Sequence, residues 1–232
     1  MFPIEITKRM NLFMIVIISK NNDWSNQLHK LVSEKIQNVI FLNTFTLEYL
    51  ESIDPEWIFF LHWSEIVQEE IFGRFKCVVV HIGNLPDDRG GSPIQNQIMK
   101  GSISTIVNLI EMKSEVDSGG IYLSEPITLQ GNLNDIWSTI AKISSKLIVQ
   151  CVENVLSPIP QFGIPTTYKR KKDNKLIVDS DKDISYIYDQ IRMLDGENYP
   201  STYIEIGKYK LEFSRAKLEN GVIISDVRIS EK

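Results

Sequence analysis

Short apolar runs alternate with segments of helical spacing along the first two-thirds of the chain, and this pattern limits the fold more than any other feature. Four runs rich in branched and aromatic residues are expected to be buried strands: Leu12–Ile18, Val39–Leu42, Trp57–Leu61 and Cys77–Val80. The segments between them are expected to be helices: Asp23–Ile36, Phe45–Ile53 and Glu65–Phe72. Because strands that alternate with helices connect by right-handed crossovers, the sequence predicts an α/β fold with a mostly parallel sheet and helices on both faces.

The rest of the chain changes character after a proline-containing stretch. Two further strands and a long helix are expected first: Thr105–Glu111, Gly120–Leu123 and Leu133–Leu156. Pro158 and Pro160 end that helix, so a linker is expected over 157–172. A helix and three strands follow: Asp183–Leu194, Thr202–Ile206, Tyr209–Ser214 and Val222–Ile229. The sequence thus predicts a main domain over 1–156 and a small C-terminal α+β region over 173–232.

Composition narrows the class of protein. The chain has 232 residues and a net charge of −5, whereas nucleic-acid-binding domains usually carry a basic face. The one basic cluster, Lys169–Lys172, is expected to be a solvated turn. Cys77 and Cys151 lie in apolar surroundings and are expected to be free thiols in a reducing compartment. No apolar run is long enough to cross a bilayer, and a cytoplasmic protein is expected.

Several common catalytic motifs are missing from the sequence. There is no HExxH, no cysteine cluster, no GxGxxG after the first strand, no Walker loop and no GxSxG. These absences argue against a catalytic metal, a dinucleotide site of the usual kind and a hydrolase nucleophile elbow.

Two of the three histidines directly follow predicted strands. His62 comes after the third strand and His81 after the fourth. In open parallel sheets, ligands bind outside the carboxyl ends of the strands. Either histidine, taken singly, is equally compatible with a capping or loop role. His29, inside a predicted helix, is expected to be an ordinary surface residue.

The loop after His81 contains two prolines and a pair of adjacent glycines, which restrict its backbone path. It reads HIGNLPDDRGGSPIQNQIMKG over 81–101. Further along, Asp117 lies in EVDSGG, where an acid before Ser-Gly-Gly is first of all a turn residue. If the fold brings Asp117 beside His81, the two side chains can orient each other and tune each other's charge.

Taken together, these motifs resemble the folate-dependent formyltransferases. The family pattern is Asn-x-His, then Leu-Pro-x-x-Arg-Gly-x-x-Pro, then an Asp that here follows His81 by 36 positions, at Asp117. The match covers Leu61–Leu129, and the alternation before it is compatible with the family's Rossmann-like sheet. The loop and two C-terminal stretches, IYDQIRMLDGENYP and KLEFSRA, look most like the sugar N-formyltransferase subgroup.

The resemblance implies transfer of a formyl group from N10-formyltetrahydrofolate to the amine of a UDP- or dTDP-linked amino sugar. It further implies a 4-amino-4,6-dideoxy sugar, a role in surface polysaccharide biosynthesis, and a homodimer. His81 would serve the oxyanion and proton transfer, and Asp117 would accept the amine proton. The expected folate-binding residues are Leu61, His62, Trp63, Glu111, Ser114 and Val116. The expected substrate-binding residues are Asn21, Asn22, Trp24, Arg89, Gly90 and Gly91, although Arg89 suits a structural role better and Trp24 also suits the core.

One departure from the family pattern leaves alternatives open. Val79 stands where the family has its asparagine, so another group must help to polarise the formyl oxygen; His62 and Asn84 are the candidates. Two other functions remain open. The chain either formylates a different amine, such as that of methionyl-tRNA, or is a catalytically inactive relative that binds folate or a sugar nucleotide.

Overall fold

A six-stranded sheet forms the body of the protein. The structure, a computed structural model, describes residues 14–154 and 156–232. The sheet order is β2-β1-β3-β4-β6-β7, with β1 (Ile15–Ser19), β2 (Val39–Leu42), β3 (Trp57–Leu61), β4 (Lys76–Ile82), β6 (Ser104–Glu111) and β7 (Ile121–Thr128). The first four strands are parallel, while β6 and β7 are antiparallel to their neighbours. The predicted α/β fold with a mostly parallel sheet is confirmed.

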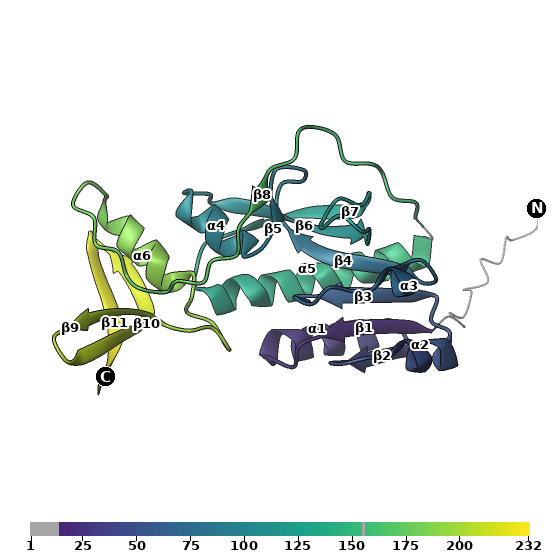
Figure 1. The fold of residues 1–232 in the computed structure, drawn as a ribbon, viewed down its shortest axis with the longest axis horizontal. Coiled ribbons are helices and arrows are strands. Elements are labelled where there is room, and N and C mark those ends of the chain that lie inside the picture. Colours follow the sequence, from purple (N-terminus) through teal and green to yellow (C-terminus); the bar gives the residue numbers. More distant parts are fainter. Residues whose placement is uncertain (1–13, 155) are drawn as a thin grey trace, which may run out of the picture.

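Helices cover both faces of this sheet (Figure 1). They are α1 (Asp23–Ser33), α2 (Leu47–Ile53), α3 (Glu69–Phe72), α4 (Pro93–Met99) and α5 (Leu133–Asn154). A large apolar cluster joins one face of the sheet to α1, α4 and α5. A smaller cluster, with Val16, Ile58 and Phe60 at its centre, joins the other face to α2 and α3. The central strands are buried on both faces, as their continuous apolar runs predict.

The structure corrects two of the predicted boundaries. The helix expected over Glu65–Phe72 is reduced to its last turn; Ile66 is 95% exposed, whereas Val67 packs against the smaller cluster from the loop before α3. His81 lies within β4, because the antiparallel ladder to β6 extends to Ile82. The start of the predicted run Leu12–Ile18 lies outside the described residues.

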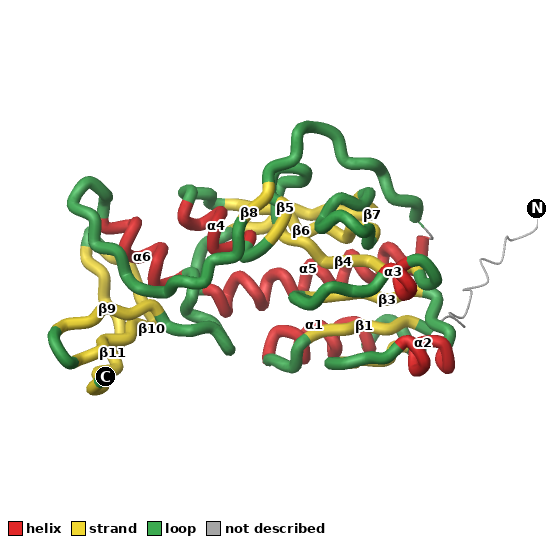
Figure 2. Tube along the Cα trace, viewed as in Figure 1, coloured by secondary structure: helices red, strands yellow, loops and turns green. Residues whose placement is uncertain are grey.

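The segment expected to be a linker, residues 157–172, pairs with the main domain; we refer to it as the crossing segment. Ile159 forms a two-way backbone bridge with Ile121 of β7, through hydrogen bonds of 2.7 and 2.9 Å. Further on, β8 (Thr167–Tyr168) pairs with β5 (Arg89–Gly90) in the loop after His81. In Figure 2 this segment is the long loop that passes over the sheet. It therefore holds a fixed path across the edge of the sheet where the predicted site lies.

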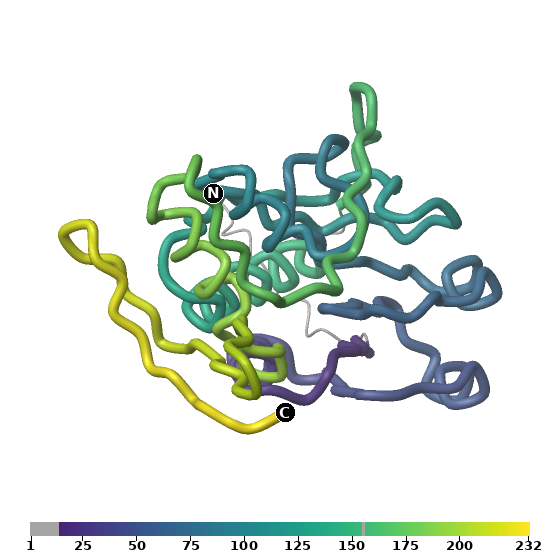
Figure 3. Tube along the Cα trace, turned by 60° about the vertical axis from the view of Figure 1, so that its left-hand side comes forward, coloured from purple at the N-terminus to yellow at the C-terminus, as the bar shows by residue number. Residues whose placement is uncertain are grey.

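The C-terminal region forms a second, smaller layer. Helix α6 (Ile184–Arg192) packs on a three-stranded antiparallel sheet of order β11-β10-β9, made of β9 (Thr202–Ile206), β10 (Tyr209–Glu219) and β11 (Val222–Glu231). Arg192 donates hydrogen bonds to the carbonyls of Leu129 and Gly131, which ties this region to the main domain. The β10–β11 hairpin stands out from the body (Figure 3).

Candidate active site

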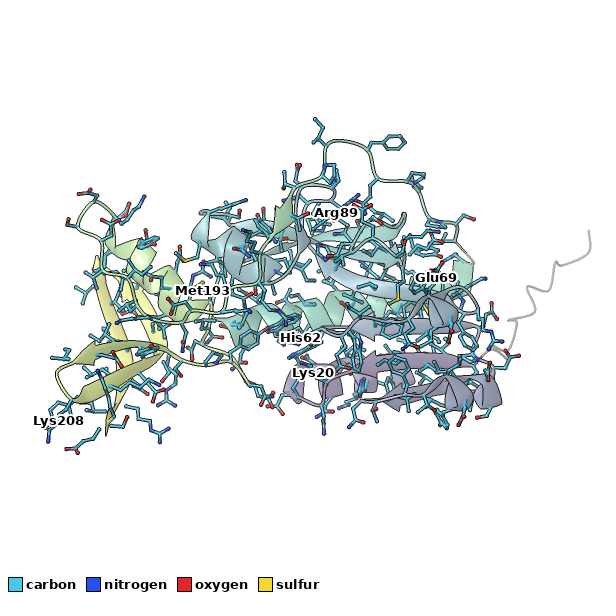
Figure 4. The ribbon with its side chains drawn as sticks, in the orientation of Figure 1. Lys20, His62, Glu69, Arg89, Met193 and Lys208 are labelled. Atoms are coloured by element: carbon cyan, nitrogen blue, oxygen red, sulfur yellow. The ribbon has the colours of Figure 1, made fainter. Side chains whose placement is uncertain are left out.

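The carboxyl ends of β1, β3 and β4 open into one cavity of about 1130 Å³. Its walls come from both parts of the chain: the strand ends, the loop after His81, the turn that carries Asp117, and the segments Arg170–Lys171 and Glu197–Pro200. Figure 4 shows Lys20 and His62 at the same end of the sheet, the end that faces the C-terminal region. The C-terminal region is thus part of the wall of this cavity.

His81 and Asp117 form a buried pair at the cavity. The Nδ1 atom of His81 lies 3.3 Å from Oδ2 of Asp117, and the side chains are 6% and 12% exposed. The other ring nitrogen, Nε2, lies 2.7 Å from the carbonyl oxygen of Asp88. Since a carbonyl oxygen only accepts hydrogen bonds, Nε2 carries a hydrogen. Both ring nitrogens are therefore engaged, so His81 can donate to an oxyanion only if one of these contacts opens.

The backbone of Asp117 is left-handed, with φ of 54°. This conformation turns its carboxylate toward both His81 and Gly90, whose N–H donates to Oδ2 at 2.9 Å. Burial raises the pKa of this carboxyl, but the hydrogen bond and charge of His81, the Gly90 N–H and the charge of Arg89 outweigh it. The pKa of Asp117 therefore lies below its usual value, and the residue is a carboxylate at neutral pH.

His62 lies in a group of aromatic side chains. The positions of the histidines in the sequence do not predict this group. Its ring centroid is 4.7 Å from that of Trp137, 5.7 Å from Trp24 and 6.1 Å from Tyr199. Trp24 and Trp137 stack at 4.6 Å. The left-handed backbone of His62, with φ of 48°, directs its ring toward these residues. We refer to His62, Trp24, Trp137 and Tyr199 as the aromatic group.

The His62 ring is neutral and keeps one unused polar atom. Burial, with smaller contributions from the charges of Lys20 and Arg170, lowers the pKa of His62 to about 4. Its Nε2 lies 3.1 Å from the hydroxyl of Tyr199. Its Nδ1 is buried and has no hydrogen-bond partner in the structure. When the Tyr199 hydroxyl donates to Nε2, the Nδ1–H is a free donor beside the cavity.

Four basic side chains line the cavity, Lys20, Lys113, Arg170 and Lys171, together with five acidic ones, Glu65, Glu69, Glu111, Asp117 and Glu197. Lys113 is ion-paired with Glu111 at 2.9 Å. Lys20 follows β1, whereas Arg170 and Lys171 come from the segment predicted to be a linker. The basic stretch Lys169–Lys172 is thus only partly a solvated turn, because two of its residues face the site. The charges of Lys20 and Arg170 both act on His62, so this side of the cavity, and not the cavity as a whole, favours the negatively charged part of a ligand.

The expected folate-binding residues lie together along another part of the cavity. Leu61, His62, Trp63, Glu111, Ser114 and Val116 all line it. Val79 lines the same wall, with Phe60 and Ile110 beside it in the ladder. The indole Nε1 of Trp63 is buried without a partner. A slot with apolar walls and two unpaired polar side-chain atoms, His62 Nδ1 and Trp63 Nε1, fits a heterocycle such as a pterin.

The other predicted site residues divide into those at the cavity and those away from it. Asn21, Asn22, Trp24, Gly90 and Gly91 line it; the Asn22 side chain also caps α1 by accepting from the Ser25 N–H at 2.9 Å. Asn84 is exposed and does not line the cavity, because its N–H and side-chain amide both bind the carboxylate of Asp88. Arg89 is buried beneath the loop and binds Gln161 and Glu115.

Sequence reasoning missed the contributions from distant segments. Trp137, Arg170, Lys171 and Tyr199 reach the cavity from the start of α5, the crossing segment and the C-terminal region. No short motif marks them; the only signal is that Tyr199 falls in the stretch that resembles the sugar subgroup. Among the described residues, no group of three or more His, Cys, Asp or Glu side chains is placed to hold a metal ion. None of the described helices is long and apolar enough to cross a membrane.

Comparisons with known proteins agree with this geometry. Residues 172–230 match the family model for the C-terminal domain of methionyl-tRNA formyltransferase. The methionyl-tRNA formyltransferase of Caldicellulosiruptor saccharolyticus is 31% identical over 185 residues, which cover 75% of this chain and 58% of that protein. The chain therefore spans a little over half the length of this curated relative.

Solved structures share this fold. A methionyl-tRNA formyltransferase from Clostridium thermocellum is 37% identical, with a TM-score of 0.88, and the match covers 94% of this chain and all of that one. An N-formyltransferase from Helicobacter canadensis, in complex with folinic acid and dTDP-3-aminofucose, has a TM-score of 0.59 over 87% of this chain and 95% of that one; its 15% identity shows a shared fold alone. On the full-length match at 37% identity, the chain belongs to the formyltransferase family.

Proposed function

We propose that this protein transfers a formyl group from N10-formyltetrahydrofolate to the amine of a nucleotide-linked amino sugar. The observation that carries the proposal is the buried His81–Asp117 pair, which lies in one cavity with both an apolar slot and a set of basic side chains. The slot suits the folate, and the basic side chains suit the phosphates of the acceptor.

Asp117 is the residue proposed to take the proton from the attacking amine. The acceptor nitrogen must lose a proton as it bonds to the formyl carbon, and a carboxylate held ionised by His81, Gly90 and Arg89 is ready to receive it. His81 then passes a proton toward the departing folate nitrogen when its 3.3 Å contact with Asp117 opens. A positioned acid–base group contributes about 10²–10⁴ in rate.

His62 is proposed to supply the donor that Val79 does not. The formyl oxygen gains negative charge as the amine attacks, and it needs hydrogen-bond donors aimed at it. Asn84 is too far out on the surface loop to serve. His62 lines the cavity, stays neutral, and has a buried Nδ1 without a partner.

The charge distribution favours a small anionic acceptor. Lys20, Arg170 and Lys171 line the cavity, in which the acidic residues Glu65, Glu69, Glu111, Asp117 and Glu197 balance the charge as a whole, so the basic charge is local. The C-terminal region, in contrast, carries twelve acidic and nine basic residues over 173–232. A surface that binds the tRNA backbone needs a net basic footprint. A sugar nucleotide requires cations only where its phosphates lie.

Methionyl-tRNA is the second candidate acceptor. The match of residues 172–230 to the C-terminal domain of methionyl-tRNA formyltransferase, and the names of the curated relatives, favour it. The acidic C-terminal region and the net charge of −5 weigh against it.

A homodimer is proposed through the free edge of the small sheet. Strand β11 pairs only with β10 among the described strands, and its Val222, Ile224 and Ile229 are more than half exposed. If two copies of β11 pair antiparallel about Val227, Asp226 of each lies opposite Arg228 of the other. Opposite charges across a strand pair stabilise it, so this register complements itself.

The test is a direct assay of the purified protein. It is mixed with N10-formyltetrahydrofolate and, separately, with UDP- and dTDP-linked amino sugars and with charged methionyl-tRNA, and release of tetrahydrofolate is followed. Release that depends on a sugar nucleotide supports the proposal. Release with methionyl-tRNA alone selects the second candidate, and folate binding without release on any amine indicates an inactive relative.

A further inference from the structure

Gln161 lies in the crossing segment, and its amide contacts the turn of Asp117 directly. Its Nε2 donates to the carbonyl oxygens of Asp117 and Gly119, each at 2.8 Å. Its Oε1 accepts from Nε and Nη2 of Arg89, at 3.2 and 2.9 Å. Both N–H groups of the amide are thus used, and its oxygen receives two hydrogen bonds. A side chain bonded this fully has one orientation.

The Asp117 turn needs such support from outside. A residue with a side chain adopts the left-handed backbone at a cost in free energy, which is smaller for Asp than for most other residues. Asp117 adopts this backbone, and its carboxylate meets His81 and the Gly90 N–H only because of it. The Gln161 amide binds the carbonyl of this same residue, so its hydrogen bonds favour the turn as observed.

Gln161 is itself held at both ends of its segment. On one side, Ile159 is bridged to Ile121 of β7. On the other, the backbone of Thr166 binds Pro86 and Arg89. Between these anchors, Phe162 and Ile164 are 81% and 86% exposed, so Gln161 is the side chain of this stretch that faces the site. We propose that Gln161 is a positioning residue, which holds the Asp117 carboxylate against His81 from the crossing segment.

Two experiments test this inference. The first, the kinetic arm, rests on the proposed function, whereas the second arm rests on the geometry alone. In the kinetic arm, Gln161→Leu removes both donors and the acceptor at similar volume. It is expected to lower kcat about 10–100-fold, with KM for folate changed less than about threefold, because a small displacement of a catalytic group is that costly. Gln161→Glu keeps the acceptor for Arg89 but loses both donors, and is expected to lose kcat to a similar extent. Phe162→Ala, one residue along and exposed, is the matched control and is expected to keep wild-type kinetics.

The second arm needs no substrate. The ¹³C shift of the Asp117 carboxyl is titrated by NMR in the wild type, Gln161→Leu, Gln161→Glu and Phe162→Ala, with thermal unfolding measured alongside. The pKa of Asp117 is expected to rise toward its usual value in both Gln161 variants and to stay low in Phe162→Ala. An unchanged Asp117 titration in folded Gln161→Leu and Gln161→Glu overturns the proposal, whatever the kinetics. If the wild type transfers formyl to no amine but the titration shifts as expected, the proposed function fails and the positioning role stands.

Discussion

His81 Nδ1 lies 3.3 Å from Asp117 Oδ2, and this pair joins two parts of the chain that are 36 positions apart. The histidine comes from the last residues of β4, and the aspartate from the turn between β6 and β7. The second ring nitrogen of His81 binds the Asp88 carbonyl. Because Nε2 is held by this carbonyl, proton transfer by His81 in the cavity would use Nδ1, the ring nitrogen that faces Asp117.

Removing the donor proposed to replace the family asparagine is expected to lower turnover. His62→Phe removes both ring nitrogens from the cavity wall while leaving His81 and Asp117 in place. Loss of one oxyanion donor typically costs about 10²–10³ in kcat, so a fall of about 10² is expected. Steady-state kinetics with the best acceptor checks this. His29→Phe, away from the cavity, is the control, and wild-type kcat in His62→Phe would rule out the role proposed for His62.

The stability of the protein is expected to fall as the pH drops from about 6.5 to about 4. Burial lowers the pKa of His62 to about 4, so over this range the unfolded chain binds a proton that the folded protein excludes. The loss is on the order of 2 kcal/mol for a buried histidine shifted this far. Burial lowers the pKa of His29 to about 4 as well, so it adds a loss of the same sign.

Urea unfolding at pH 7.5 and pH 5 measures this effect. His62→Phe keeps an aromatic ring beside Trp24 and Trp137 but cannot titrate. The difference in unfolding free energy between the two pH values is expected to shrink in this variant and to persist in part because His29 remains. An undiminished difference in His62→Phe would show that His62 is charged in the folded protein or exposed to solvent.

The basic side chains at the cavity are expected to act on acceptor binding. Arg170→Gln should raise KM for the sugar nucleotide about 10-fold with kcat nearly unchanged, since a charge-assisted contact to a phosphate is worth about 1.5–3 kcal/mol and solvent screens part of it. The effect should weaken with added salt. Lys172→Gln changes the same basic stretch at a position that does not line the cavity. Equal KM values in the two variants would contradict the assignment.

The sequence predicts the parts of this site that local pattern can reveal. His62 follows β3 and His81 lies near the end of β4, so their meeting at one sheet edge follows from topology, and the family motif adds Asp117. The aromatic group is different, because Trp137 and Tyr199 reach His62 only through the packing of α5 and the C-terminal region. Nothing in the spacing of residues encodes these docking positions.

The crossing segment shows the same limit. Its prolines and basic residues are typical of a solvated linker, so the sequence predicts a linker over 157–172. Its role depends on backbone bridges to β7 and β5 that form only once the sheet exists. Arg170 and Gln161 gain their contacts in the site from those bridges. Asn84 is the opposite case, since its place in the motif loop suggests chemistry while its amide only closes a turn on Asp88.

The proposed dimer gives a prediction about mass in solution. Val227→Lys places a like charge at the centre of the proposed β11 pair, where two copies of the same residue meet. This variant is expected to run as a monomer in size-exclusion chromatography with light scattering, whereas the wild type runs as a dimer. Ser201→Lys, in the same region before β9, is the control. A wild-type monomer at micromolar concentration would refute the proposal.

The central claim is that Asp117 and His81 perform formyl transfer in this cavity. The most direct measurement is mass spectrometry of an amino-sugar nucleotide incubated with N10-formyltetrahydrofolate and either the wild type, Asp117→Asn or Asp87→Asn. Asp87 is an exposed acid on the His81 loop, so its variant controls for charge and folding. We expect a mass gain of one formyl group with the wild type and with Asp87→Asn, and an initial rate about 10³-fold lower with Asp117→Asn. Equal initial rates for Asp117→Asn and the wild type would contradict the claim.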